Sequence, residues 1–177
     1  VTYKEDIPEE WRRSWIVNLQ HHYRKNFDSA ELINWLSSAG NLTFSNYWQV
    51  GYQALKDWGK DDDRETRGNG LYKKPSRQNM LLLASSDPRE SVVGTIFYTI
   101  GSDDRKARFS SINLELELKP ASHFTLEMSA SRSTSADEWA WVYNFGTSPD
   151  TTIFADRSTE TWDLTLRGTY VFTRDLT

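Results

Sequence analysis

Three stretches of this chain alternate apolar and polar side chains almost without interruption. Between residues 112 and 118 every second residue is Ile or Leu, and the residues between them are Asn113, Glu115 and Glu117. A second stretch begins at Phe124, and a third covers residues 162–172. A period of two is typical of β-strands that have one apolar face and one polar face. The polar face carries full charges, so we expect it to meet water or other polar groups.

The composition favours a transmembrane β-barrel over a soluble core. Hydrophobic residues make up 37% of the 177 residues while aromatic residues reach 14%, and in a barrel each strand needs only one apolar face. The net charge of −4 argues against a nucleic-acid partner. The absence of cysteine excludes disulfides and thiolate metal sites. No apolar run is long enough for a transmembrane helix.

The pattern predicts a single domain over residues 1–177 with about seven strands. They cover residues 11–25, 42–58, 78–86, 91–102, 108–119, 124–145 and 152–172. The two longer connections are residues 26–41 and 59–77. In the first, an N-cap at Asp28 and helical spacing allow a short helix.

Short turns at 87–90 and 120–123 should lie at one end of the sheet, and longer connections at the other. This asymmetry is typical of outer-membrane barrels, which have short periplasmic turns and long extracellular loops. The last two strands should project far outside, since a strand of about 20 residues is about 65 Å long. The 26–41 connection does not fit, because it is long but falls on the short-turn side. Seven strands leave two open edges, so missing sequence or another chain should supply the remaining strands.

The chain begins at Val1 without Met or a signal peptide and stops in what reads as a turn, at residues 173–177. We therefore expect it to be an internal piece of a longer protein.

Two motifs resemble a known family. The segment Trp162-Asp-Leu-Thr-Leu-Arg-Gly-Thr-Tyr-Val-Phe-Thr-Arg-Asp-Leu-Thr177 resembles the strand and Tyr-x-Phe-Thr-x-Asp-Leu turn of a family of Gram-negative surface proteins. The segment 64–76 resembles that family's Arg-x-Thr-Arg-Gly-Gly loop, with Asn69 in place of the second Gly. In those proteins, a family-9-like carbohydrate-binding module precedes a C-terminal barrel domain of unknown function. The resemblance implies an outer-membrane location and a glycan context, and it transfers no catalytic residues.

Four charged residues are candidates for a cluster inside the barrel. Glu115, Glu117 and Glu127 share the polar face of one predicted hairpin, and Arg167 lies on the polar face of the last strand. The favoured interpretation is an ion-pair network that fills the interior. Contact with solutes, sorted by charge, is an alternative. Acid–base catalysis of glycoside cleavage by paired carboxylates is a third.

Aromatic residues form two further groups. Trp139, Trp141, Tyr143 and Phe145 should share one face of the projecting hairpin, where they pack on protein or stack on sugar rings; packing is favoured. The other group, predicted to join the interfacial aromatic girdles, lies near the ends of the apolar face. It consists of Trp162, Tyr170 and Phe172.

No cofactor or metal site is predicted. The acidic segment 61–65 lacks the alternating ligand spacing of a calcium loop, which favours a solvated loop. His21 and His22 are adjacent on a predicted strand and point to opposite faces, so they cannot chelate one metal together. We find no nucleophile elbow, phosphate loop or zinc motif.

The leading prediction is an all-β, antiparallel up-and-down meander that forms a segment of a transmembrane β-barrel with long extracellular hairpins. It would lie in the bacterial outer membrane with the lipid bilayer as its partner, in a glycan context and without nucleic acid. Its function would be passage, tethering or assembly at the cell surface, not catalysis. The alternative is a soluble β-sandwich module that binds carbohydrate through residues 139–145. A hydrolase-associated domain is a third hypothesis.

Overall fold

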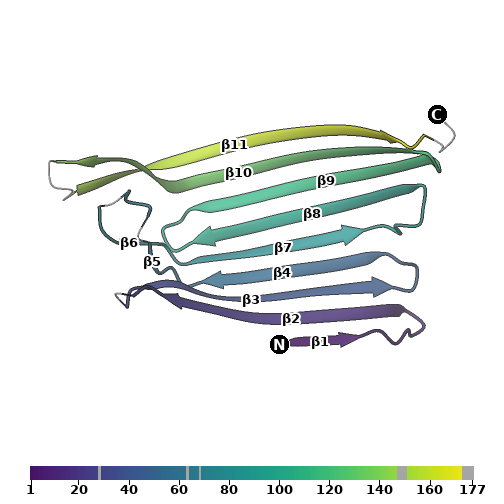
Figure 1. The fold of residues 1–177 in the computed structure, drawn as a ribbon, viewed down its shortest axis with the longest axis horizontal. Helices are drawn as coiled ribbons and strands as arrows, with labels where there is room; N and C mark the ends of the chain where they lie inside the picture. The colour runs from purple at the N-terminus through teal and green to yellow at the C-terminus, as the bar shows by residue number, and fades with distance from the viewer. Residues whose placement is uncertain (28, 63, 68, 147–150, 173–177) are drawn as a thin grey trace.

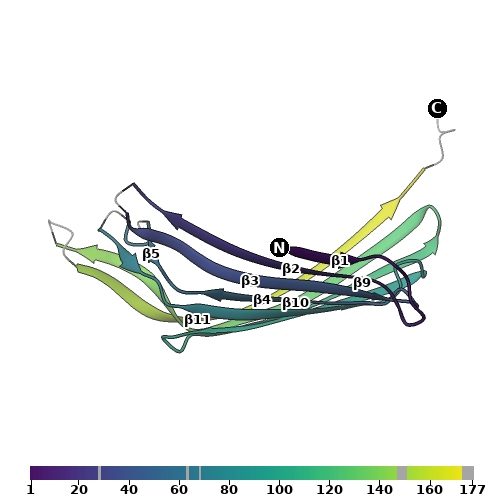
Figure 2. The ribbon, with the colours of Figure 1, turned by 90° about the horizontal axis from the view of Figure 1, so that it is seen from below.

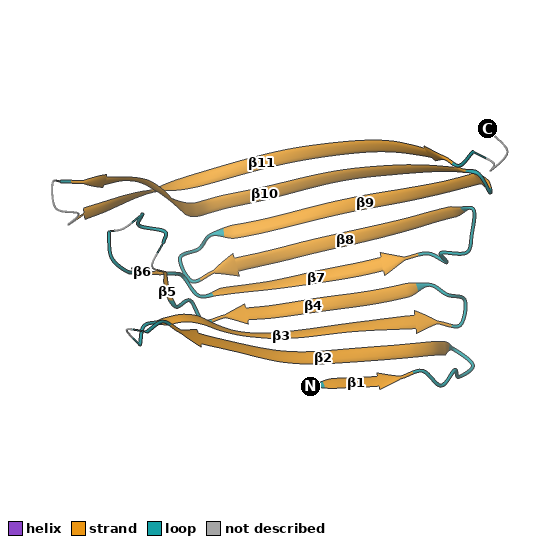
Figure 3. Cartoon of the chain, viewed as in Figure 1, coloured by secondary structure: helices purple, strands orange, loops and turns teal. Residues whose placement is uncertain are grey.

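The computed structural model describes residues 1–27, 29–62, 64–67, 69–146 and 151–172. Nine strands form one antiparallel sheet in the order β1-β2-β3-β4-β7-β8-β9-β10-β11, and β5 and β6 form a separate two-stranded pair (Figure 1). Figure 3 shows strands and loops only, and these residues contain no helix. The strands are β1 (Thr2–Glu5), β2 (Arg12–Lys25), β3 (Glu31–Phe44), β4 (Gln49–Asp57), β5 (Asp61–Asp62), β6 (Tyr72–Lys73), β7 (Arg77–Ser85), β8 (Val92–Asp103), β9 (Arg108–Ala121), β10 (Phe124–Phe145) and β11 (Thr151–Tyr170). The predicted all-β antiparallel meander is confirmed.

Because neighbouring strands are antiparallel, alternate connections lie at opposite ends of the sheet (Figure 1). We call one the turn end; its connections cover residues 6–11, 45–48, 86–91 and 122–123. The other is the loop end, with connections at 26–30, 58–76, 104–107 and the tip of the β10–β11 hairpin. The 58–76 loop holds the β5–β6 pair, and β10 and β11 extend past β9.

The sequence allowed a short helix near residues 28–36. This prediction is wrong, because Glu31–Phe44 forms the strand β3. Its apolar residues lie on both faces, as Leu32 and Ile33 do, so local spacing resembles a helix. Hydrogen bonding to β2 on one side and β4 on the other determines the extended form. The proposed N-cap Asp28 lies outside the described residues.

The strand predicted over residues 42–58 is consequently two elements. β3 ends at Phe44 and β4 begins at Gln49, with a tight turn between them in which Tyr47 has a φ of 65°. Residues 26–30 are then a short connection at the loop end, which removes the predicted misfit of a long 26–41 connection. With β1, which pairs with β2, the sheet has nine strands instead of seven.

Residues directly opposite each other on paired strands share a face, so the register divides the sheet into two faces. We call one the apolar face. Its central row consists of Trp15, Leu42, Val50, Ala84, Ile96, Leu114, Ala130 and Leu164. The opposite side, which we call the polar face, is rich in Ser, Thr, Asn and charged residues on β9, β10 and β11, and includes residues 113, 115, 127, 129 and 165. On β7 and β8 the same side also carries Leu81, Leu83, Val93 and Phe97.

The sheet is one curved and twisted layer, as Figure 2 shows. Among the described residues, only two hydrophobic side chains are buried, those of Val93 and Ala107. Leu114, Leu164 and Leu166 on the apolar face are 49%, 84% and 68% exposed. A sheet normally buries its apolar face against another layer. No such layer is found within the described ranges, so the apolar face is uncovered.

Aromatic rings cover two glycines, one on each face. On the apolar face, a Cβ on Gly40 would lie 2.5 Å from the ring of Tyr52, whose hydroxyl is 3.0 Å from the Ser38 Oγ. On the polar face, a Cβ on Gly101 would overlap the ring of Phe109. The rings supply packing that glycine lacks, which holds the strand register at these points.

The sheet is not closed, since β1 and β11 each pair on one side only. No helix in the described part of the chain is both long and apolar enough to cross a membrane.

Candidate functional site

The four charged residues predicted as a cluster lie together on the polar face. Glu117 is directly opposite Glu127, which is opposite Arg167, so three strands contribute to one row. Glu115 lies in the next row, opposite Ser129. These residues line a hollow of about 480 Å³.

The carboxylates of this cluster are balanced by nearby donors. The guanidinium of Arg167 lies 3.6 Å from the Glu127 carboxylate, and the Lys119 ammonium lies 2.9 Å from that of Glu117. The Asn113 amide donates to the Glu115 carboxylate over 2.8 Å. Like charges directly opposite each other destabilise a sheet, and the two cations offset that repulsion. The cluster therefore contains two ion pairs, Arg167–Glu127 and Lys119–Glu117, and Lys119 is a member that the sequence pattern did not identify.

The four aromatic residues predicted to share one face are divided between two faces. The register shifts between Trp141 and Tyr143, so that Trp141 is opposite Phe154 while Tyr143 is opposite Ile153. Adjacent residues on β11 point to opposite sides, and their partners do the same. Trp139 and Trp141 therefore lie on one face, and Tyr143 and Phe145 on the other.

Arginines of the 58–76 loop and the β8–β9 turn contact Trp141 and Trp139, and Trp139 is still 47% exposed. The Arg67 guanidinium lies 3.8 Å from the centre of the Trp141 ring, and the Arg105 guanidinium lies 4.6 Å from that of Trp139. Tyr72 of the loop stacks on Phe154 of β11, with ring centres 4.6 Å apart. Arginine over an aromatic face is a favourable electrostatic contact as well as a packing contact. This pair of tryptophans fits the packing interpretation.

Hydrogen bonds join the same loop to the tip of the hairpin. Asn69 donates to the Thr152 hydroxyl over 2.6 Å, and Asn144 donates to the carbonyl of Thr66 over 2.8 Å. The Thr66 hydroxyl in turn donates to the carbonyl of Gly70, and Thr66 is buried. Asn69, which replaces a glycine of the motif noted above, thus anchors the loop to β11.

A second charged network lies on the polar face near the loop end. Arg77 and Arg157 approach the Glu138 carboxylate to 3.4 and 3.3 Å, and Arg77 also lies 3.8 Å from Asp103. Burial opposes ionisation of Glu138. Hydrogen bonds from Arg157 and Ser135 and the charges of both arginines outweigh it and lower the pKa of Glu138. Glu138 follows the bulge at Asp137, which has a φ of 58°.

The acidic loop segment is occupied by protein contacts. Burial raises the pKa of Asp62, but the Lys74 ammonium at 2.6 Å and the backbone amides of Arg64 and Glu65 lower it more, so the net shift is downward. Asp63 lies outside the described residues. The Nε2 of His21 lies within hydrogen-bond distance of the Asn34 side-chain oxygen, and the His21 ring meets the Trp58 ring edge-on. The His22 ring stacks on Trp35. Within the part of the chain that the structure describes, no group of three His, Asp or Glu side chains is placed to hold a metal ion.

The apolar-face aromatics at the turn end are clustered. The rings of His123 and Tyr170 lie 5.1 Å apart, and those of Tyr170 and Phe172 lie 4.8 Å apart. Trp162 lies further along β11, 70% exposed, beside Arg132. The end of the strand-and-turn motif, residues 173–177, lies outside the described residues.

Searches of curated proteins and of solved structures give no match to this chain. A family model described as a domain of unknown function matches all of residues 1–177. The chain therefore belongs to the DUF5916 family, as its resemblance to an uncharacterised domain predicted.

Proposed function

We propose that this chain is a segment of an outer-membrane β-barrel, with lipid against its apolar face and an aqueous interior lined by its polar face. It would act in passage, tethering or assembly at the cell surface. The observation that carries the proposal is the apolar face, which extends over the large sheet with no protein layer described above it. Lipid is the solvent that makes such a face stable, because a transmembrane barrel presents its apolar residues outward.

On the apolar face, the first cations towards the loop end are Lys56 on β4 and Arg108 on β9, which lie in one register row. On β10 the first cation is Arg132, four residues nearer the turn end than that row. The loop-end border of the apolar band is therefore level from β4 to β9 and moves towards the turn end at β10.

The turn-end border of the band shifts in the same direction. On β4 this border lies at Val50, which the register aligns with Ala130 of β10. On β10 the border lies at Phe124, six residues nearer the turn end than Ala130. At about 3.3 Å per residue and about 4.8 Å between strands, the turn-end border shifts by about 20 Å over about 19 Å. This corresponds to strands tilted by about 45° from the normal of the band, the upper end of the range for membrane barrels.

The height of the band also fits a bilayer. On β11 the apolar residues extend from Trp162 to Tyr170, about 26 Å along the strand. At a tilt of about 40° this corresponds to about 20 Å, comparable to the apolar band of about 25 Å in outer-membrane barrels. The short turns would then face the periplasm, and the 58–76 loop and the β10–β11 hairpin the exterior.

The alternative of a soluble sandwich that binds carbohydrate is less well supported. It requires a second sheet on the apolar face, whereas the described residues form one layer. It also requires an open aromatic platform, whereas Arg67 of the 58–76 loop lies over Trp141 and Arg105 of the β8–β9 turn lies over Trp139. The predicted glycan context stays a proposal that rests on the resemblance to surface proteins with a carbohydrate-binding module.

The proposal is tested by expressing the parent protein and separating its membranes. We expect the protein in the outer-membrane fraction, soluble only in detergent, with a gel mobility that changes on boiling. A monomer that is soluble in buffer and has the same mobility with and without boiling would refute the proposal.

A further inference from the structure

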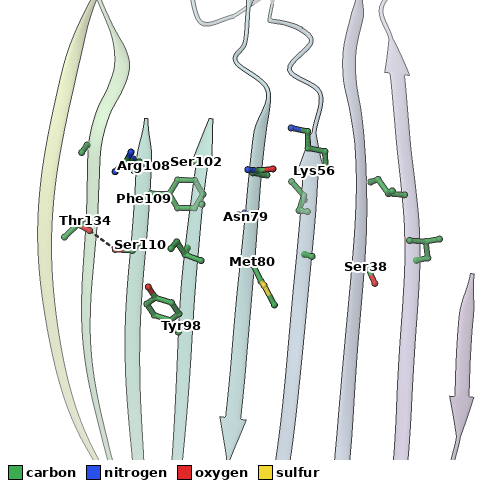
Figure 4. A pocket seen from close by; sticks show the side chains of 18 residues that line it. Ser38, Lys56, Asn79, Met80, Tyr98, Ser102, Arg108, Phe109, Ser110 and Thr134 are labelled. Atoms are coloured by element: carbon green, nitrogen blue, oxygen red, sulfur yellow. Dashed lines mark hydrogen bonds between the residues drawn. The ribbon is translucent and has the colours of Figure 1, made fainter. Parts of the chain in front are cut away.

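A hollow of about 920 Å³ lies in the apolar face, at its border towards the loop end. Its floor is apolar and includes Leu19, Met80, Tyr98 and Ile100. Figure 4 shows Lys56, Asn79, Ser102 and Arg108 at one end of this hollow, with Met80 and Tyr98 nearer the middle of the sheet. One end of the hollow is thus polar and cationic, and the remainder is apolar.

Four residues of the polar end form one register row. Lys56 is opposite Gln78, Gln78 is opposite Ser102, and Ser102 is opposite Arg108. The row crosses four strands and therefore measures about 14 Å between its outer Cα atoms. It places a cation at each end and two neutral hydrogen-bond donors between them.

The two cations lack carboxylate partners. Neither Lys56 nor Arg108 forms an ion pair with any described residue, whereas Arg132 on the same face pairs with Glu160 at 2.9 Å. None of the described residues that line the hollow is acidic. This end of the hollow therefore has a net positive charge that is complementary to an anion.

We propose that the hollow binds a phosphate-bearing lipid, with the acyl chains on the floor and the headgroup phosphate at the row formed by Lys56, Gln78, Ser102 and Arg108. This inference rests on the proposed function, in which Lys56 on β4 and Arg108 on β9 are the first cations beyond the apolar band, where the lipid headgroups lie. The two cations attract the phosphate, and the Gln78 amide and Ser102 hydroxyl can donate hydrogen bonds to its oxygens. The apolar floor starts one row nearer the middle of the band, at Met80 and Ile100, about 7 Å away.

The test measures lipid binding to the detergent-solubilised full-length protein by native mass spectrometry. The probes are hexa-acylated lipid A with its phosphates, the same lipid without phosphate, and inorganic phosphate. The variants are Lys56→Gln, Arg108→Gln and the double variant. The matched control is Arg24→Gln, which removes an exposed cation near the loop end on the polar face.

We expect each single substitution to weaken binding of phosphorylated lipid A about fivefold and the double variant about 25-fold. Arg24→Gln should leave the affinity unchanged, and the dephosphorylated lipid should bind the wild type as weakly as lipid A binds the double variant. Gel mobility with and without boiling checks that each variant is folded.

Equal binding to the double variant and the wild type, with the barrel intact, would overturn the inference and leave the proposed function standing. Inorganic phosphate that binds as tightly as lipid A would overturn the choice of a lipid. A wild-type protein that needs no detergent would overturn the site and the proposed function together.

Discussion

Substituting Leu114 with arginine is expected to destabilise the protein in a bilayer and to leave it almost unaffected if the apolar face meets only water. Leu114 lies in the central row of the apolar face and is 49% exposed. A lipid-facing arginine costs about 2–4 kcal/mol at the bilayer midplane and about 0–1 kcal/mol near the interfaces. The corresponding drop in the folding equilibrium constant is roughly 30- to 700-fold. In water, an exposed substitution usually changes stability by less than about 0.5 kcal/mol.

Two controls isolate the effect of depth and of face. Ser110→Arg is on the same strand and face as Leu114 but two rows nearer the loop end, one row from the border cation Arg108. Asn113→Arg is adjacent to Leu114 on the polar face. We expect each control to cost no more than about 1 kcal/mol.

The assay is equilibrium unfolding of the full-length protein in phospholipid vesicles, titrated with guanidinium and followed by tryptophan fluorescence. Free energies of unfolding are compared among Leu114→Arg, Ser110→Arg and Asn113→Arg. Equal costs for Leu114→Arg and Ser110→Arg would refute the assignment of lipid to the centre of the apolar face.

Three further predictions concern the loop end and the polar face. The hydrogen bonds of Glu31 with Lys60 and Tyr23 lower the pKa of this carboxyl to about 2. Its contribution to stability is therefore present above about pH 4.5 and is lost as the pH falls towards 2. Glu31→Gln should reduce the loss of stability measured between about pH 5 and 2, and an unchanged loss would contradict this. Gly101→Val should lower the unfolding free energy by about 1–3 kcal/mol, because the new valine side chain would overlap the Phe109 ring. The double variant Gly101→Val, Phe109→Ala should recover part of that loss, as measured by guanidinium titration. Trp141→Ala should release the 58–76 loop from the β10–β11 hairpin and increase its cleavage rate by trypsin in intact cells, without changing the boiled and unboiled gel mobilities; a loop as resistant as in the wild type would argue against this packing.

The period-two pattern predicted the strands whose two faces differ most. On β9 and β11 the apolar residues lie almost entirely on one side, so the local sequence and the sheet favour the same register. β3 was missed because Leu32, Ile33 and Trp35 place apolar side chains on both faces. The partner strands β2 and β4, which are separate in sequence, determine that segment.

The charged cluster could be predicted and the aromatic platform could not. Residues 115, 117 and 127 belong to stretches whose apolar and polar residues alternate, so the alternation assigns their side chains to one face. A register shift between Phe124 and Leu126, beside the connecting turn, aligns Glu127 with Glu117. Beyond Asp137, which adopts a left-handed φ, and again between Trp141 and Tyr143, β10 departs from regular pairing. A bulge adds one residue to one strand and moves every later side chain of that strand to the opposite face. The sequence contains no glycine at these two positions of β10 that would indicate a bulge.

The central claim is that lipid covers the apolar face and water the polar face, and spin labelling tests it most directly. The chain has no cysteine, so single cysteines introduced at residues 112–118 label one position at a time. In vesicles, we predict that labels at 112, 114, 116 and 118 are accessible to oxygen and protected from a water-soluble nickel chelate, with the reverse at 113, 115 and 117. Nickel accessibility at every position, or even-numbered labels shielded from both reagents, would contradict the account.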